Sequence, residues 1–125
     1  GVGASDYKGL DDLLKKLRAD KKGIILSTNT AEIGMIDDNL VSDHFYLQAT
    51  SGGKTVTHSD FLALKDEAEK TAYTLVDQDK EKQNREIIAK YCRADDLVCF
   101  DRFTTVCDRD TERCVVFDDD GYKLR

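Results

Sequence analysis

The sequence predicts one α+β domain, in which helices come first along the chain and an antiparallel meander of strands follows. Two observations predict this class. Apolar residues recur at helical spacing before Tyr73, and the apolar period falls to two after it. Clusters of charged residues, such as those at 77–85 and 108–113, separate short apolar segments as turns separate strands. A chain of 125 residues is close to the commonest domain size, so we expect residues 1–125 to form one domain.

The N-terminal part of the chain predicts two helices. The apolar stripe of the first comprises Leu10, Leu13, Leu14 and Leu17. This helix either continues past Gly23, where the glycine costs about 1 kcal/mol, or ends there and leaves residues 24–26 as a strand. Thr30 can then cap a short second helix, because its hydroxyl can accept a hydrogen bond from a free backbone N–H. The apolar residues of that helix are Ile33, Met35 and Ile36.

A hairpin and a third helix are predicted next. Residues 44–49 (HFYLQA) form the first clear strand, and residues 54–57 (KTVT) form its partner across Gly52 and Gly53. Ser59 is expected to cap the helix that follows. The inner face of this helix comprises Phe61, Leu62, Leu64 and Ala68.

Four strands are predicted in the second half of the chain. They cover residues 72–77, 86–93, 97–107 and 114–117, and the last leads on to residues 122–124. Asp118-Asp119-Asp120-Gly121 lies before that final segment. An EF-hand loop with Gly121 at its sixth position would begin at Val116 and end beyond Arg125, so the required carboxylates are missing at both ends. We therefore interpret the three aspartates as a turn and expect no metal site.

Composition and charge narrow the possible partners. The chain is 40% apolar and 35% charged, as in a globular rather than a disordered domain, and its formal net charge is −6. That balance argues against nucleic acid or an anionic membrane surface as a partner, because both require a basic face. No apolar run approaches the roughly 20 residues of a membrane-spanning helix. The chain has no initiator methionine, which predicts a processed, mature protein, and no nucleotide-binding motif, so no cofactor is expected.

Four cysteines lie in the last third of the chain: Cys92, Cys99, Cys107 and Cys114. They lack the closely spaced pairs of a zinc site and favour two disulfides in an oxidising compartment, which predicts a secreted protein. Four reduced, buried thiols are the alternative. A hairpin centred between residues 95 and 96 places Cys92 opposite Cys99, within the distance that a disulfide spans. A second hairpin, centred between residues 110 and 111, places Cys107 opposite Cys114.

The predicted strands are apolar on both faces, which predicts a homodimer. In the segment 97–107, one face carries Val98, Phe100, Thr104 and Val106, and the other carries Leu97, Cys99, Phe103 and Cys107. A sheet that helices cover on one side should leave a polar face to water. An apolar outer face therefore indicates contact with another sheet, most simply in a symmetric dimer.

Two segments give the chain a resemblance to a known superfamily. The stretch MIDDNLVSDHFYL (35–47) is similar to the segment at which nuclear transport factor two-like domains leave their second helix and enter their first strand. GGKTVTHSDFLAL (52–64) resembles the glycine, short strand and capped helix that follow there. This superfamily includes ketosteroid isomerases and SnoaL cyclases. The resemblance implies a cone-shaped, cystatin-like fold, in which N-terminal helices pack on a curved antiparallel sheet.

The same resemblance places Asp43 at the position of the general base of the isomerases, which moves a proton while an oxyanion hole holds the enolate. The acid and the tyrosine of that hole would fall at Arg113 and Ala19, so the catalytic set is incomplete. Asp43 is better interpreted as a cap at the entry of a strand. The ligand pocket that the resemblance implies around Asp43 comprises Phe45, Tyr46, Phe61 and Tyr91.

We therefore expect a secreted, non-catalytic binding domain for a small apolar ligand or a protein partner. One alternative is a SnoaL-like isomerase or cyclase with Asp43 as general base, and another is a purely structural dimeric scaffold. Cystatin inhibitors share the helix-on-sheet outline, but their Gln-x-Val-x-Gly motif is not found here and a Pro-Trp loop is impossible in a chain without Pro or Trp. His44 and His58 have no catalytic partner at a defined spacing, so we interpret both as surface residues.

Overall fold

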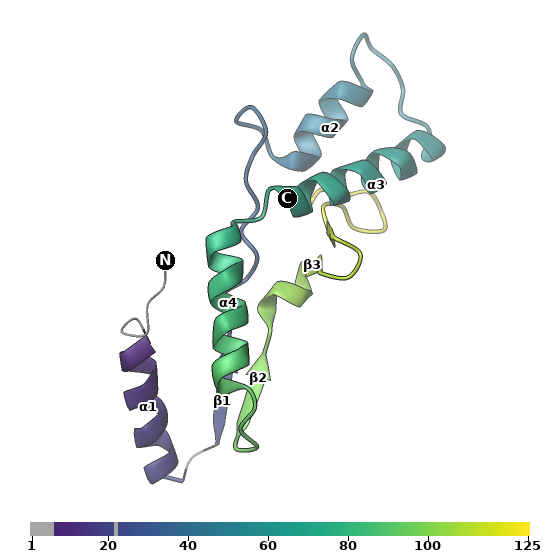
Figure 1. The fold of residues 1–125 in the computed structure, drawn as a ribbon. Helices are drawn as coiled ribbons and strands as arrows, with labels where there is room; N and C mark the ends of the chain where they lie inside the picture. The colour runs from purple at the N-terminus through teal and green to yellow at the C-terminus, as the bar shows by residue number, and fades with distance from the viewer. Residues whose placement is uncertain (1–6, 22) are drawn as a thin grey trace.

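The computed structural model describes residues 7–21 and 23–125, which combine helices with short strands. In chain order the elements are α1 (Lys8–Ala19), β1 (Ile24–Ser27), α2 (Val41–Ala49), α3 (His58–Thr74), α4 (Gln78–Tyr91), β2 (Leu97–Phe100), the 3-10 helix η2 (Arg102–Thr105), β3 (Cys107–Asp108) and β4 (Arg113–Cys114). The α+β class predicted from the sequence is confirmed. The molecule is elongated, with α1, β1 and β2 towards one end and α2 and α3 towards the other (Figure 1).

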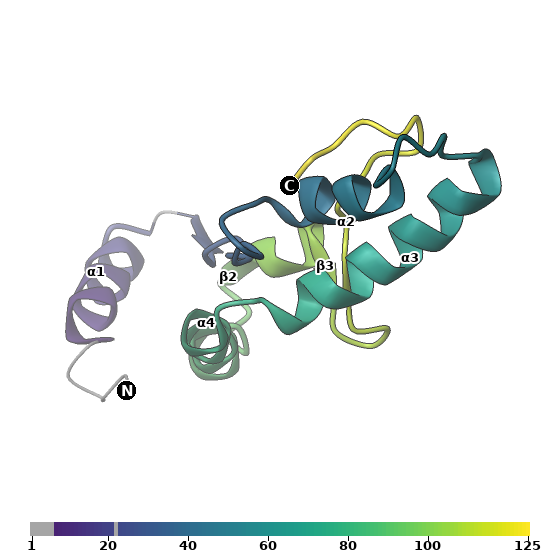
Figure 2. The ribbon, with the colours of Figure 1, turned by 90° about the horizontal axis from the view of Figure 1, so that it is seen from above.

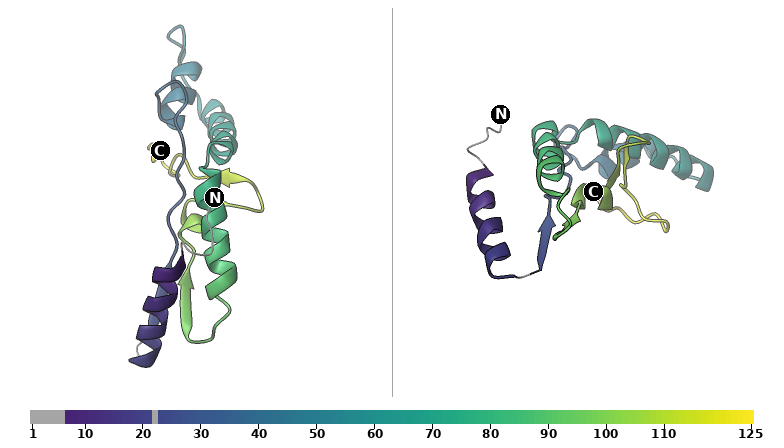
Figure 3. Two further views of the ribbon diagram at one scale, coloured as in Figure 1. Left: turned by 60° about the vertical axis from the view of Figure 1, so that its left-hand side comes forward. Right: turned by 60° about the horizontal axis from the view of Figure 1, so that its bottom comes forward.

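The end of the molecule that contains α1 has a pair of parallel strands, β1 and β2, with Ile24 opposite Leu97. One face of this pair packs with α1 and α4, which stand at the same end of the molecule (Figure 3), into a small apolar core. The buried residues of this core are Tyr7, Leu14, Ile24, Tyr91 and Leu97. The Tyr91 hydroxyl donates a hydrogen bond to Asp11 Oδ1 at 2.7 Å, which joins α4 to α1 and lowers the pKa of the Asp11 carboxyl.

The larger core lies between α2, α3 and the β3–β4 hairpin. Its buried residues are Val41, Phe45, Leu64, Ala68, Ala72, Val76, Phe103, Val106, Cys107, Cys114, Val116 and Phe117. β3 and β4 pair in antiparallel register, with Cys107 opposite Cys114. The guanidinium of Arg113 binds the carboxylate of Asp66 on α3, and this hydrogen bond lowers the pKa of Asp66. The hairpin is thus joined to α3 by charge as well as by apolar packing.

Local capping explains where two of the helices begin. α3 begins after Thr57, whose hydroxyl accepts a hydrogen bond from Asp60 N at 3.1 Å, while the Asp60 carboxylate accepts one from Thr57 N at 3.1 Å. This reciprocal cap lowers the pKa of Asp60, and it replaces the predicted cap at Ser59. α4 begins after Asp77, whose carboxylate accepts from the backbone N–H groups two and three residues further on.

The predicted strand at 44–49 is wrong, because residues Val41–Ala49 form α2. Val41 and Phe45 are four residues apart and are both buried, while Tyr46 and Leu47 are exposed. That spacing is one face of a helix, but the short apolar run at 45–47 suits a strand equally well. The predicted partner strand at 54–57 is also wrong, since these residues form a loop that ends at the cap of α3.

The four strands predicted in the second half are only partly present. Residues 72–77 contain the end of α3, and 86–93 lie mostly in α4, so both predictions are wrong. The predicted strand 97–107 stops at Phe100, because the Asp101 carboxylate accepts from Phe103 N at 3.2 Å and so begins η2. The last predicted segments survive as β4 and a single bridge between Phe117 and Lys123.

The structure also tests the predicted elements of residues 8–36 and the predicted curved antiparallel sheet. α1 ends at Ala19 and β1 begins at Ile24, so the alternative with a break at Gly23 is confirmed. The predicted short helix after residue 30 is wrong, because Ile33 forms an isolated bridge with Val76. The described residues contain one parallel and one antiparallel strand pair in place of the curved antiparallel sheet of a cone.

Candidate binding sites

Two disulfides hold the C-terminal third of the chain, and both pairings are those predicted from the spacing: Cys92–Cys99 and Cys107–Cys114. Cys107 and Cys114 face each other across the β3–β4 pair, as the predicted register requires. The register predicted for the first pair is wrong, since Cys92 ends α4 and its bridge ties that helix to β2. Two disulfides fit a protein of an oxidising, extracellular compartment.

The three aspartates before Gly121 lie in a turn, as predicted. Asp118 Oδ1 accepts from Asp120 N at 3.0 Å and from Tyr122 N at 2.8 Å, and Asp118 N donates to Tyr122 O at 2.9 Å. Gly121 has a φ of 87°, a conformation that favours glycine. The turn sends the C-terminal segment back beside α2 (Figure 2).

The structure brings part of the predicted pocket together. Asp43 and Tyr46 line a groove of about 280 Å³ between α2 and the C-terminal segment. The buried residue Phe117 also lines this groove, and its ring packs edge-on against the ring of Phe61 with centroids 5.5 Å apart. Two of the five predicted pocket residues therefore line one groove, and a third, Phe61, contacts a residue of its wall.

The remaining candidate residues lie elsewhere. Phe45 is buried in the larger core, and Tyr91 is buried in the core at the opposite end of the molecule. The ring of His44 packs edge-on against Phe45 at 5.2 Å, and His58 is exposed at the start of α3.

The groove also contains an ion pair and a buried hydroxyl that sequence reasoning missed. Lys123 Nζ lies 3.0 and 3.2 Å from the two carboxylate oxygens of Asp43. Ser42 is 1% exposed, and its Oγ has no hydrogen-bond partner within the described part of the chain. Tyr46 and Tyr122 are both exposed. No local signal could have paired Lys123 with Asp43, because the two are 80 residues apart and share no motif.

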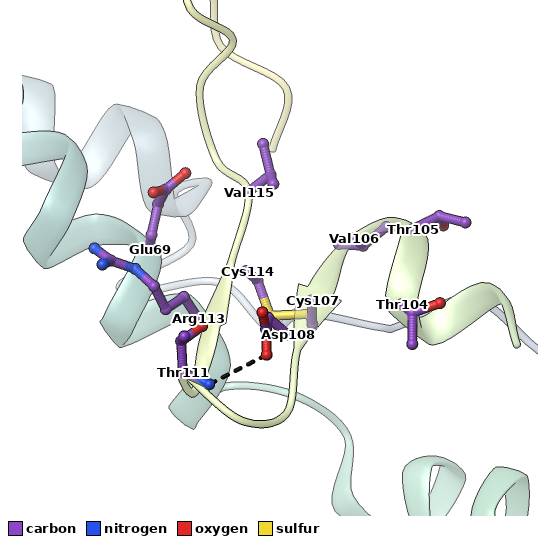
Figure 4. Close-up of a pocket in the computed structure, with 10 residues that line it drawn as sticks. All are labelled: Glu69, Thr104, Thr105, Val106, Cys107, Asp108, Thr111, Arg113, Cys114 and Val115. Carbon is purple, nitrogen blue, oxygen red and sulfur yellow. Dashed lines mark hydrogen bonds between the residues drawn. A yellow bond between two sulfur atoms is a disulfide. The ribbon is translucent and has the colours of Figure 1, made fainter.

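A second hollow, of about 260 Å³, lies beside the β3–β4 hairpin (Figure 4). Several of its charged groups already have partners within the protein. The Asp108 carboxylate accepts from Thr111 N at 3.1 Å, and Arg113 binds Asp66. Arg113 Nε is buried without a hydrogen-bond partner among the described residues, but Asp108 closes the hairpin turn and Arg113 anchors the hairpin to α3, so we interpret this hollow as a structural feature of the hairpin.

A partly buried charge cluster connects α4 to the end of β2 and to the hairpin turn. The Glu81 side chain is 3% exposed, and its Oε1 accepts from Arg109 Nε at 2.6 Å and from Arg85 Nε at 2.9 Å. Arg109 also binds Asp101 at 2.7 Å and lies over the ring of Phe103. Burial lowers the pKa of Arg109, but its bonds to Asp101 and Glu81 outweigh that effect and raise it. Glu81 Oε2 is buried without a hydrogen-bond partner among the described residues, whereas Oε1 and Arg109 are each held by two partners within the protein, which indicates a structural role.

The second face of the β1–β2 pair is apolar and exposed. Ile25, Val98 and Phe100 are 77%, 64% and 52% exposed. The register places Ile25 beside Val98 and Ser27 beside Phe100, so these four residues form one surface, which we call the outer sheet face. The predicted alternation along residues 97–100 is confirmed, because Leu97 is buried in the core and Val98 is exposed.

Comparisons of the chain with protein-family models, with curated proteins and with solved structures give no match. Within residues 7–21 and 23–125, none of the helices has the length and apolar character needed to cross a membrane. The resemblance to nuclear transport factor two-like domains stays a prediction.

Proposed function

We propose that this protein is a secreted, non-catalytic binding domain that forms a homodimer through the outer sheet face. The observation that carries the proposal is the exposure of Ile25, Val98 and Phe100 on one face of a parallel strand pair. Parallel strands are ordinarily covered on both faces. Among the described residues, α1 and α4 cover one face of this pair and leave the other to solvent.

A second copy of the chain suits this face in charge and in symmetry. None of the four residues of the outer sheet face is charged, so a partner with the same net charge of −6 meets no like charge at the centre of the contact. A two-fold axis that runs along the strands between β1 and β2 places Ile25 of one copy over Val98 of the other. The same patch thus complements itself, as a symmetric dimer requires.

The size of the face sets the strength of the dimer. Full burial of one such side chain contributes about 1.5–3 kcal/mol. Three side chains per copy, each already partly covered, then contribute roughly 5–10 kcal/mol to the dimer. Association itself costs about 4–15 kcal/mol. We therefore expect a weak, concentration-dependent dimer with a dissociation constant in the micromolar range or above.

The surroundings of Asp43 support binding rather than catalysis. A general base of the isomerase type works beside an oxyanion hole in a closed cavity. Asp43 lies in the first turn of α2, its side chain is 38% exposed, and it pairs with Lys123. A SnoaL-like isomerase remains the alternative, and it would lose turnover of a ketone substrate in Asp43→Asn. A purely structural scaffold would dimerise in the same way but bind no ligand.

Sedimentation velocity from roughly ten micromolar to one millimolar tests the dimer. We expect the wild type to shift from monomer towards dimer as concentration rises. Val98→Lys should stay monomeric, because its charge would be buried at the contact. Leu62→Lys is the matched control, since Leu62 is an exposed apolar residue on α3 and lies off the outer sheet face. A wild type that remains monomeric, or a Val98→Lys variant that associates as the wild type does, contradicts the proposal.

A further inference from the structure

We infer that the groove between α2 and the C-terminal segment binds a small organic ammonium ion that carries an apolar group. The inference is independent of the dimer, because the groove and the outer sheet face lie towards opposite ends of the molecule (Figure 1). Three features of the groove carry it: the carboxylate of Asp43, the hydroxyl of Ser42 and the aromatic residues around them.

The carboxylate of Asp43 already accepts an ammonium group. Lys123 Nζ lies 3.0 Å from one of its oxygens and 3.2 Å from the other, so the chain itself shows how an ammonium fits there. The Lys123 side chain is exposed, and exposed ion pairs contribute little to stability. A ligand ammonium can therefore take the place of Lys123, which acts as a weak tethered competitor.

The hydroxyl of Ser42 supplies a further hydrogen-bonding group that the described part of the chain leaves unused. Ser42 lines the groove next to Asp43, and its buried Oγ has no hydrogen-bond partner there. Buried polar groups in folded proteins nearly always have one. An ammonium carries three N–H donors, two for the oxygens of Asp43 and a third for Ser42 Oγ, once that hydroxyl, which is closed to solvent in the free protein, turns towards the groove.

The aromatic residues suit the rest of such a ligand. Tyr46 and Tyr122 are the exposed aromatic residues of the groove, and the buried residue Phe117 also lines it. Aromatic faces attract cations, and Phe117 offers an apolar surface to the group that the ammonium carries. A volume of about 280 Å³ is at the small end for ligand sites, which points to a ligand with a single ring.

The charge around the groove favours a cation over an anion. Lys123 is the one basic residue among the described residues that line it, and its charge is matched by Asp43. The acidic turn 118–120 directly precedes Gly121, which also lines the groove. Asp43 is the one acidic residue among the described residues that line the groove, and its carboxylate attracts a cation and repels an anion.

Titration of the isotope-labelled full chain with benzylamine, followed by proton–nitrogen correlation spectra, tests the inference. Benzyl alcohol and benzoate are the neutral and anionic probes of similar shape. We expect benzylamine, and neither of the others, to shift the amide signals of residues 42–46 and 121–123. Asp43→Asn should weaken benzylamine binding about tenfold, because it removes a charged acceptor. Lys123→Gln should strengthen it roughly two- to fivefold, because it removes the tethered competitor.

Three outcomes would overturn the inference. The first is that benzylamine shifts none of these signals at millimolar concentration. The second is that benzyl alcohol shifts them to the same extent, which would show an apolar hollow without recognition of charge. The third is that Lys123→Gln binds benzylamine more weakly than the wild type does. The spectra also report whether each variant is folded, so a loss of binding cannot be mistaken for unfolding.

Discussion

Replacing Glu81 by alanine should lower the free energy of unfolding by about 2–4 kcal/mol. The hydrogen bond from Arg109 Nε, at 2.6 Å to a side chain that is 3% exposed, is charge-assisted and should contribute about 1.5–3 kcal/mol. The bond from Arg85 should add only about 0.2–1 kcal/mol, because the arginine is exposed. Arg109 would keep Asp101 as a partner but would lose its second counter-charge.

Equilibrium unfolding in urea, followed by far-ultraviolet circular dichroism, measures this change. Glu67→Ala is the matched control, because Glu67 is exposed on α3 and the two substitutions bring a similar gain in helix propensity. We expect the control to stay within about 0.5 kcal/mol of the wild type. If the two variants unfold with equal free energy, the interpretation of Glu81 as the centre of a stabilising cluster is wrong.

Acid, loss of a disulfide and one turn substitution should each weaken the fold. The bond from Arg113 lowers the pKa of Asp66, so its contribution should be complete above the unfolded-state pKa of about 3.9 and be lost as pH falls through the folded-state value. Thermal midpoints of the wild type and Asp66→Asn should therefore differ at neutral pH and converge in acid, and a gap that widens in acid refutes this. Replacing Cys107 and Cys114 together by serine should cost roughly 2 kcal/mol in urea unfolding, since the bridge closes a short loop, and an unchanged midpoint refutes this. Gly121→Ala should lower the free energy of unfolding by about 1–2 kcal/mol, because alanine is strained at the positive φ of this position. The added Cβ itself would not clash, because its nearest ring atom, on Phe61, would lie at an ordinary 3.6 Å. A thermal midpoint equal to that of the wild type counts against this.

Features that depend on neighbouring residues could be predicted from the sequence. The turn at 118–121 follows from the chemistry of aspartate and glycine alone, and the structure forms it with the Asp118 carboxylate as the closing acceptor. Cys107 and Cys114 stand symmetrically about a polar turn, so their spacing predicts both the hairpin and the bridge. The Cys92–Cys99 pair is predicted correctly from a hairpin that the structure lacks, because the chain turns back between them after a helix instead.

Features that depend on distant partners could not be predicted. In the segment 41–49, the three consecutive apolar residues 45–47 fit helix and strand periods equally well, and burial of Val41 with Phe45 in the larger core decides for the helix. The parallel pairing of β1 with β2 joins segments about 70 residues apart, which no turn signal marks. The Asp43–Lys123 pair likewise depends on the path of the C-terminal segment. The resemblance to cone-shaped domains also implied strands at 44–49 and 54–57, where the structure has α2 and a loop.

The alternation of residues 97–100 between a buried and an exposed face is the link between the sequence prediction and the proposed dimer. The most direct test is an isotope-filtered nuclear Overhauser measurement on an equal mixture of labelled and unlabelled protein, at a concentration where sedimentation shows the dimer. We expect intermolecular contacts between the methyl groups of Ile25 and Val98, and from these to the ring of Phe100. Intermolecular contacts confined to other surfaces, with none from these three side chains, would contradict the proposed interface.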